Sequence, residues 1–159
     1  MAAVPIGLTA FDLGSRFIGE VTERPGSGLG QDHPFIVWCH GLCGGEAPDE
    51  VPWCGVWLSA ICWLLRLPRS KSKSARSWLA VGSAVELHRA EVGFDVVILK
   101  RGPGLQPGPD ILQAPGHVGL FAGFDAGTNT VQILAGNQGN AVSVRPFPTD
   151  RVLGIRRLR

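Results

Sequence analysis

Hydrophobic residues at helical spacing predict helices in the first half of the chain. In residues 9–21 the apolar positions fall roughly on one helical face, and Thr9 can cap the start. A second, amphipathic helix is expected over residues 35–43, where two glycines would end it. Residues 66–74 are basic and rich in serine, which predicts an exposed loop, and a short helical piece is expected over residues 75–80.

The longest apolar run covers residues 53–65 and predicts a third helix, buried on all sides. The run is too long for a typical strand and lacks the alternation of a half-buried one. Pro52 lies where a proline just inside a helix start is tolerated. Cys54 is therefore expected in the first turn of this helix.

The second half of the chain has the pattern of a sheet. Five segments are β-branched and aliphatic and are bounded by Gly, Pro, Asn or Asp; they are residues 94–100, 117–124, 130–135, 141–145 and 152–157. Short links at 125–129 and 138–140 favour antiparallel hairpins. Helices followed by an antiparallel sheet of about five strands make the expected class α+β. Between the first two strands, residues 102–116 carry four prolines and should form an irregular excursion near the front of His117.

Composition restricts the classes of function. A chain of 159 residues, 45% hydrophobic and 18% charged, is typical of one globular domain, here spanning residues 1–159. The formal net charge of +2 is too small for the basic stripe of a nucleic-acid binder, and we interpret the arginines of residues 151–159 as a solvated edge. No apolar run is long enough for a membrane span. Residues 1–8 lack the features of a conventional export signal, so we expect synthesis in the cytoplasm.

The cysteines are expected to be reduced, because a chain of this length needs no disulfide staples. They are Cys39, Cys43, Cys54 and Cys62. Cys39 and Cys43, with His33 and His40 nearby, suggest zinc, but the second ligand pair usual in structural zinc sites is missing. A pair of thiols in a loop or helix turn is favoured, and neither a metal nor a cofactor is expected.

Cys54 and His117 are the candidates for nucleophilic chemistry. A cysteine at the start of a helix meets free backbone N–H groups and the positive end of the helix dipole, which favour the thiolate. A histidine at the start of a buried strand can accept the thiol proton and later protonate the leaving amine. A buried cysteine is more often inert, as we expect of Cys62, but the Pro-Trp-Cys-Gly context favours catalysis for Cys54. We interpret His33, His40 and His88 as surface residues.

The third member of such a site would hold the imidazole from a neighbouring strand. Antiparallel pairing of residues 117–124 with 130–137 places Asn137 opposite His117, which nominates Asn137. The chain order Cys, His, Asn, with the helix before the sheet, is the papain-like arrangement. Trp53 most economically supplies core area, and as the neighbour of Cys54 it is also a candidate wall of a substrate cleft.

Six short motifs spread over most of the chain carry a family resemblance. They are Asp49-Glu-Val-Pro-Trp-Cys-Gly55, Ala75-Arg-Ser-Trp-Leu79, Gly93-Phe-Asp-Val-Val97, Gly116-His-Val-Gly119, Ala135-Gly-Asn-Gln138 and Arg151-Val-Leu-Gly-Ile-Arg156. The set resembles the small phage and bacterial peptidoglycan hydrolases of the NlpC and CHAP type, a papain-like superfamily of cysteine, histidine-dependent amidohydrolases and peptidases.

The resemblance implies that Cys54 is the nucleophile, His117 the base and Asn137 the residue that orients it, in a cleft over the sheet edge. Many relatives have a fourth, acidic site residue where this chain has Ala135. The chain departs from that four-residue pattern. Another departure is Phe94, inserted before the aspartate that begins the first strand. The remaining candidates for the cleft are Asp49 and Glu50, which would shape it or bind a substrate amine unless they are simple solvated charges, and Gln138.

The implied reaction cleaves an amide bond of the peptidoglycan stem through a thioester, as an endopeptidase or an N-acetylmuramoyl-L-alanine amidase. The backbone N–H of Cys54 would serve the oxyanion hole. Peptidoglycan is the expected partner, reached through a holin pore, in a phage particle or by an injection machine. Three roles stay open: a phage endolysin or tail-associated lysin, an injected antibacterial effector with a cognate immunity protein, and a non-catalytic wall-binding or virion structural domain.

Overall fold

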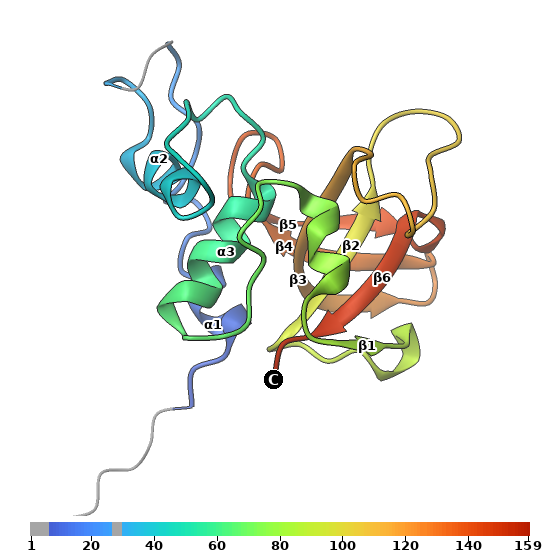
Figure 1. Ribbon diagram of the computed structural model, residues 1–159. Helices are drawn as coiled ribbons and strands as arrows, with labels where there is room; N and C mark the ends of the chain where they lie inside the picture. The colour runs from blue at the N-terminus through green and yellow to red at the C-terminus, as the bar shows by residue number, and fades with distance from the viewer. Residues whose placement is uncertain (1–6, 27–29) are drawn as a thin grey trace, which may run out of the picture.

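The computed structural model describes residues 7–26 and 30–159, in which helices pack on one sheet (Figure 1). The α-helices are α1 (Ala10–Ser15), α2 (Pro34–Gly41) and α3 (Cys54–Leu64). The 3-10 helices are η1 (Ala75–Ala80), η2 (Leu87–Arg89) and η3 (Thr149–Arg151). The strands are β1 (Ser83–Val85), β2 (Asp95–Lys100), β3 (Gly116–Asp125), β4 (Thr130–Ala135), β5 (Ser143–Pro148) and β6 (Val152–Arg157). Most of the segment 1–8, interpreted above for its lack of an export signal, lies outside the described residues.

The strands form one antiparallel sheet in the order β1-β6-β2-β3-β4-β5. The α-helices lie together on one side of this sheet, and η1 also packs on it (Figure 1). The predicted α+β class is confirmed, with hairpins joining β3 to β4 and β4 to β5. The strand β1 was not predicted, because it has three residues of which two are exposed, so no apolar pattern marks it. No helix in the described parts of the chain has the length and apolar character that a membrane crossing needs.

Helix α3 is the central element of the core. Every residue from Cys54 to Cys62 is buried, as the run of apolar residues predicts. The helix begins at Cys54 itself, and Pro52 lies just before the N-cap residue Trp53 rather than inside the helix. Cys54 therefore occupies the first helical position.

Helix α1 is shorter than its periodicity predicts. Thr9 caps it as expected, in a reciprocal capping box with Asp12. The helix ends at Ser15 rather than continuing to residue 21. The reason is tertiary: the carbonyl of Val21 accepts a hydrogen bond from the Val142 N–H at 3.0 Å, which draws this segment to the loop before β5.

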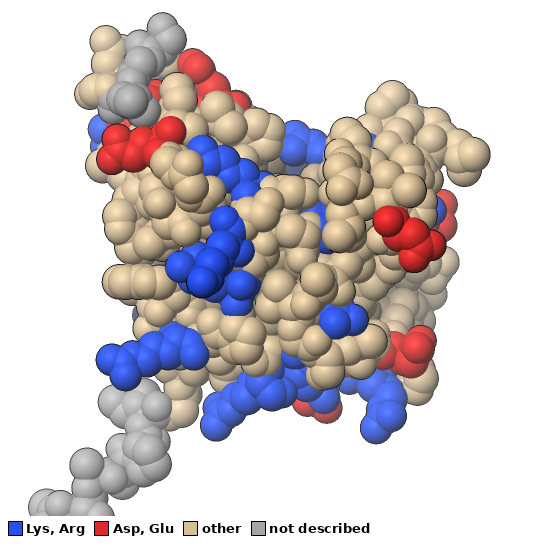
Figure 2. Space-filling view, viewed as in Figure 1, with Lys and Arg blue, Asp and Glu red and all other residues tan. Residues whose placement is uncertain are grey.

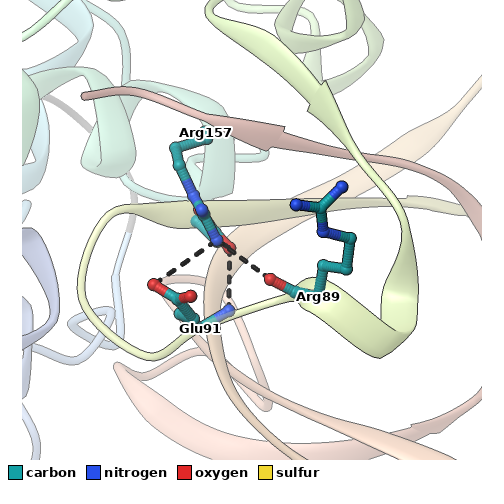
Figure 3. A network of polar contacts seen from close by, with 4 residues as sticks. Arg89, Glu91 and Arg157 are labelled. Atoms are coloured by element: carbon teal, nitrogen blue, oxygen red, sulfur yellow. Dashed lines mark hydrogen bonds and ion pairs between the residues drawn. The ribbon is translucent and has the colours of Figure 1, made fainter.

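An ion pair between a buried aspartate and a partly exposed arginine fastens β2 to β6 (Figure 3). Arg157 donates from Nε and Nη2 to the two carboxylate oxygens of Asp95, each at 2.7 Å, and Asp95 is 1% exposed. Nη2 also donates to the carbonyl of Arg89 at 3.0 Å, and Glu91 lies 3.6 Å away. The hydrogen bonds and charge of Asp95 raise the pKa of the Arg157 guanidinium. The aspartate that follows Phe94 thus joins β2 to β6 where β2 begins and β6 ends.

Candidate active site

The start of α3 meets β3 where β3 has no partner in β4. The β3–β4 ladder begins at the pair Leu120–Leu134, so the preceding residues of β3 are not paired with that strand. There the backbone N–H of Val118 lies near the Cys54 sulfur and acts to lower the pKa of the thiol. This contact places the sulfur beside the strand position that follows His117.

Cys54 is 3% exposed. Burial raises the pKa of the thiol. The backbone N–H of Val118, the positive charge of Arg101, and the backbone N–H groups of Gly55 and of Cys54 itself act in the opposite direction and lower it by less. The pKa of Cys54 is therefore raised, whereas the sequence predicted a pKa lowered by the helix start. The N–H groups of the helix start do favour the anion, but removal of the sulfur from water outweighs them.

His117 is the second residue of β3 and is 6% exposed. Its ring lies 5.5 Å from that of Phe147, and its Nε2 lies 3.1 Å from Gln138 Oε1. Burial lowers the pKa of His117 to about 4; the hydrogen bond to Gln138 raises it, and the charge of Arg101 lowers it further. The imidazole is therefore neutral at neutral pH, as a general base must be.

The orientation of Gln138 decides which imidazole nitrogen accepts a proton. Its amide nitrogen donates to the carbonyls of Ile133 and Ser143, at 3.2 and 2.5 Å. Oε1 must then face His117 as an acceptor, which assigns the ring hydrogen to Nε2. Nδ1 is left with a free lone pair, the form needed to take a proton from a thiol.

Asn137 has a different role from the predicted one. Its side chain, oriented to match its neighbours, donates to Glu23 Oε1 and accepts from the Trp53 N–H, each at 3.2 Å. Strand β4 ends at Ala135, and Asn137 has a φ of 57°, so the chain leaves the extended register on which the prediction rests. Asn137 therefore holds Trp53, the residue before Cys54, and Gln138 holds the imidazole.

Trp53 belongs to the core and not to a cleft wall. It is fully buried, and its indole N–H donates to Glu23 Oε1 at 2.9 Å. Gly136 allows this packing, because a Cβ at that position would lie 2.4 Å from the indole ring. Trp53 thus anchors the chain segment that precedes α3 in the core.

Asp49 is also structural, whereas Glu50 is exposed on the surface. Asp49 is fully buried, and one of its oxygens accepts from the backbone N–H groups of Arg24 and His33 at 2.9 and 2.8 Å. These bonds fasten two loops together, which leaves Asp49 out of reach of a substrate amine.

Neither the other cysteines nor the other histidines assemble a metal site within residues 7–26 and 30–159. All four cysteines are unpaired, and burial raises the pKa of Cys62 to about 12. His40, expected at the surface, is fully buried because α2 packs on α3. Its pKa is lowered mainly by burial and then by the charge of Lys73. His33 caps α2 by accepting from the Phe35 N–H.

A pocket of about 550 Å³ opens beside His117. Cys54 is not part of its wall. The pocket is lined by side chains from the ends of several strands and loops: Lys100, Arg101, His117, Asn137, Gln138, Arg145, Pro146, Phe147 and Arg151, with Gly102 and Gly139. Sequence reasoning missed its basic residues, because they are separated along the chain and nothing in their local pattern groups them.

The comparisons with known proteins bear on the fold. The sequence matches no family model and no curated protein. Among solved structures, NlpC1 from Trichomonas vaginalis is similar over 94% of this chain, with a TM-score of 0.54 and 15% identity. The chain has an NlpC-like fold. It spans 42% of the length of that neighbour, and at this identity the likeness concerns the fold alone.

In this fold Cys54 begins α3 and His117 is the second residue of β3, and Val118 of β3 lies near the Cys54 sulfur. The Val118 N–H reaches the sulfur from the residue next to His117, and the charge of Arg101 acts on both groups. A neutral thiol and a neutral imidazole can form an ion pair by one proton transfer when they lie within bonding distance of each other.

Within this NlpC-like fold, Arg76 organises the loop in front of His117. Arg76 is fully buried and donates to the carbonyls of four residues in the excursion between β2 and β3. These carbonyls belong to Pro107, Gly108, Ile111 and Pro115, at 2.8 to 3.1 Å. One guanidinium thus replaces the regular hydrogen bonds that a proline-rich loop cannot make.

Replacing Arg76 with alanine is expected to release this loop and to lower the free energy of unfolding by about 3 kcal/mol, because several carbonyls lose a charged donor. Urea denaturation and amide hydrogen exchange of residues 102–116 measure the two effects. Arg76→Lys keeps the charge but not the fork of donors, and should restore only part of the stability. Unchanged exchange in the loop of the alanine variant would contradict this role.

Acid is expected to destabilise the protein through His117. The folded-state pKa of about 4 lies below the ordinary value of 6.5, so the folded state favours the neutral ring. The corresponding stability, about 3 kcal/mol, is fully present above pH 6.5 and is lost as the pH falls toward 4. An NMR titration of the imidazole should show a midpoint near 4, and a midpoint near 6.5 would refute the assignment.

Proposed function

We propose that the protein is a papain-like cysteine hydrolase that cleaves an amide bond in the stem peptide of peptidoglycan. The observation that carries this proposal is the orientation of His117. Gln138 fixes its Nε2–H and leaves Nδ1 as the proton acceptor, and the Cys54 sulfur lies near Val118, the residue that follows His117 in β3. The NlpC-like fold and the ordered motifs of the sequence support the same chemistry.

The reaction begins with transfer of the Cys54 thiol proton to His117 Nδ1. The thiolate attacks the amide carbonyl, and the Cys54 N–H stabilises the resulting oxyanion. The C–N bond then breaks, the imidazolium protonates the leaving amine, and a thioester remains on Cys54. Water, deprotonated by His117, cleaves the thioester and restores the thiol. Because the resting pair is neutral, substrate binding must favour the ion pair.

The proposed target is the bacterial cell wall. The motif set supports a phage endolysin or tail-associated lysin, which would reach the wall through a holin pore or in the phage particle. An injected effector would use the same site and be neutralised by a cognate immunity protein. The bond is either one between two amino acids of the stem or the one between muramic acid and alanine.

Mass spectrometry of purified peptidoglycan digested by wild type and by Cys54→Ala tests the proposal. New fragments are expected with wild type alone, and the mass of their new ends identifies the bond. Intact peptidoglycan after treatment with folded wild-type protein would overturn the proposed activity.

A second candidate is a non-catalytic wall-binding or virion structural domain of the same fold. The burial of Cys54 and its raised thiol pKa favour this candidate. It predicts wall binding without hydrolysis and a Cys54 thiol that iodoacetamide does not modify at neutral pH. Alkylation of Cys54 that abolishes fragment release would exclude it.

A further inference from the structure

The pocket beside His117 carries an excess of positive charge. Lys100, Arg101, Arg145 and Arg151 line it, and no carboxylate side chain does. The whole chain has 15 basic and 13 acidic residues, so this grouping is not a consequence of a basic protein. On the face shown in Figure 2, acidic side chains lie mainly toward the margins. A pocket of this composition attracts an anion.

Two of the four cations also build the wall of the pocket. Arg151 donates to the carbonyl of Lys100 at 3.2 Å and to that of Gly102 at 2.8 Å. Lys100 in turn donates from Nζ to the carbonyl of Asp150 at 3.1 Å. Carbonyl partners carry no net charge, so both side chains keep their full positive charge while their positions are fixed.

Arg101 and Arg145 are exposed and form no ion pair in the described parts of the chain, where both salt bridges belong to Arg157. The guanidinium of Arg145 lies over Gly139, where a Cβ would come within 2.5 Å of Nη2. Gly139 follows Gln138, the partner of His117. The guanidinium of Arg145 thus lies next to Gln138, which orients the imidazole.

We propose that this pocket binds a free carboxylate of the substrate close to the scissile bond, and that Arg145 makes the enzyme prefer the free acid to its carboxamide. This inference rests on the proposed function. A guanidinium binds a carboxylate through two parallel charged hydrogen bonds, whereas an amide carries no charge and offers one acceptor. Stem peptides carry carboxylates that are either free or amidated, so the preference would select between kinds of cell wall.

The test compares kcat/KM for synthetic stem peptides whose glutamate α-carboxyl is free or amidated. Wild type is expected to cleave the free acid about tenfold to a hundredfold more efficiently, as expected for loss of one charged hydrogen-bond pair. Arg145→Gln should lose this preference because its kcat/KM falls much more on the acid than on the amide. Arg89→Gln removes the same charge from an exposed residue outside the pocket and should retain the preference. Equal rates on both peptides in wild type, or an unchanged preference in Arg145→Gln, would overturn the inference.

A binding experiment separates this inference from the proposed function. Calorimetry with Cys54→Ala should show tighter binding of the free acid than of the amide, and Arg145→Gln in that background should remove the difference. If wild type cleaves neither peptide but this pattern holds, the proposed function fails and the carboxylate site stands. Inorganic phosphate that binds more tightly than the free-acid peptide, or equal binding of the two peptides, would refute the carboxylate site.

Discussion

Replacing Cys54 with alanine is expected to abolish release of fragments from peptidoglycan, with a loss of at least about 10³-fold in rate, because no other group can form the thioester. The protein should remain folded. Only a sulfur atom is removed from the interior, which costs on the order of 1 kcal/mol. Mass spectrometry of the digest and circular dichroism measure the two quantities.

Cys62 provides the matched control for this experiment. It lies on the same helix, is fully buried and has a pKa raised to about 12. Cys62→Ala should therefore lose a similar, small amount of stability and keep its activity. Activity that survives in Cys54→Ala, or disappears equally in both variants, would remove Cys54 from the mechanism.

Gln138→Ala is expected to lower kcat by about 10²-fold with little change in KM, because the imidazole loses the acceptor that fixes its tautomer and orientation. Its effect on catalysis should exceed that of Asn137→Ala, which removes contacts to Trp53 and Glu23 and not to His117. Steady-state kinetics at neutral pH, with stability measured alongside, separates the two variants. A larger loss of kcat in Asn137→Ala would restore the residue that the sequence nominated.

The misassignment of Asn137 has a simple physical origin. The predicted register continues the pairing of Leu120 with Leu134 and does place residue 137 opposite residue 117. Pairing by register assumes an extended chain, but Asn137 adopts a left-handed conformation, which asparagine tolerates better than most residues. The turn directs Gln138 back to the ring, and two carbonyls hold it there. The sequence did show two adjacent amides after the strand, Asn137 and Gln138. Which of them contacts His117 depends on the turn, which the sequence did not reveal.

The pKa of the Cys54 thiol is a second property that the sequence could not predict. The helix start was correctly located, and its N–H groups do favour a thiolate. The sulfur is almost completely buried and lies near Val118 of β3, a residue far from Cys54 in the chain. Burial is the largest influence on the thiol pKa, so its direction was decided by packing that no local pattern contains.

The sequence alone determined the order of the elements, the α+β class, the position of Cys54 at the start of a buried helix and that of His117 at the start of a strand. These features depend on apolar spacing, caps and turn residues, which act over a few neighbouring positions. The tertiary structure decided which amide holds the imidazole, how dry the sulfur is, and which separated cations surround the pocket. Those properties depend on contacts between residues far apart in the chain. The backbone conformation of one residue, Asn137, is enough to change which side chain reaches His117.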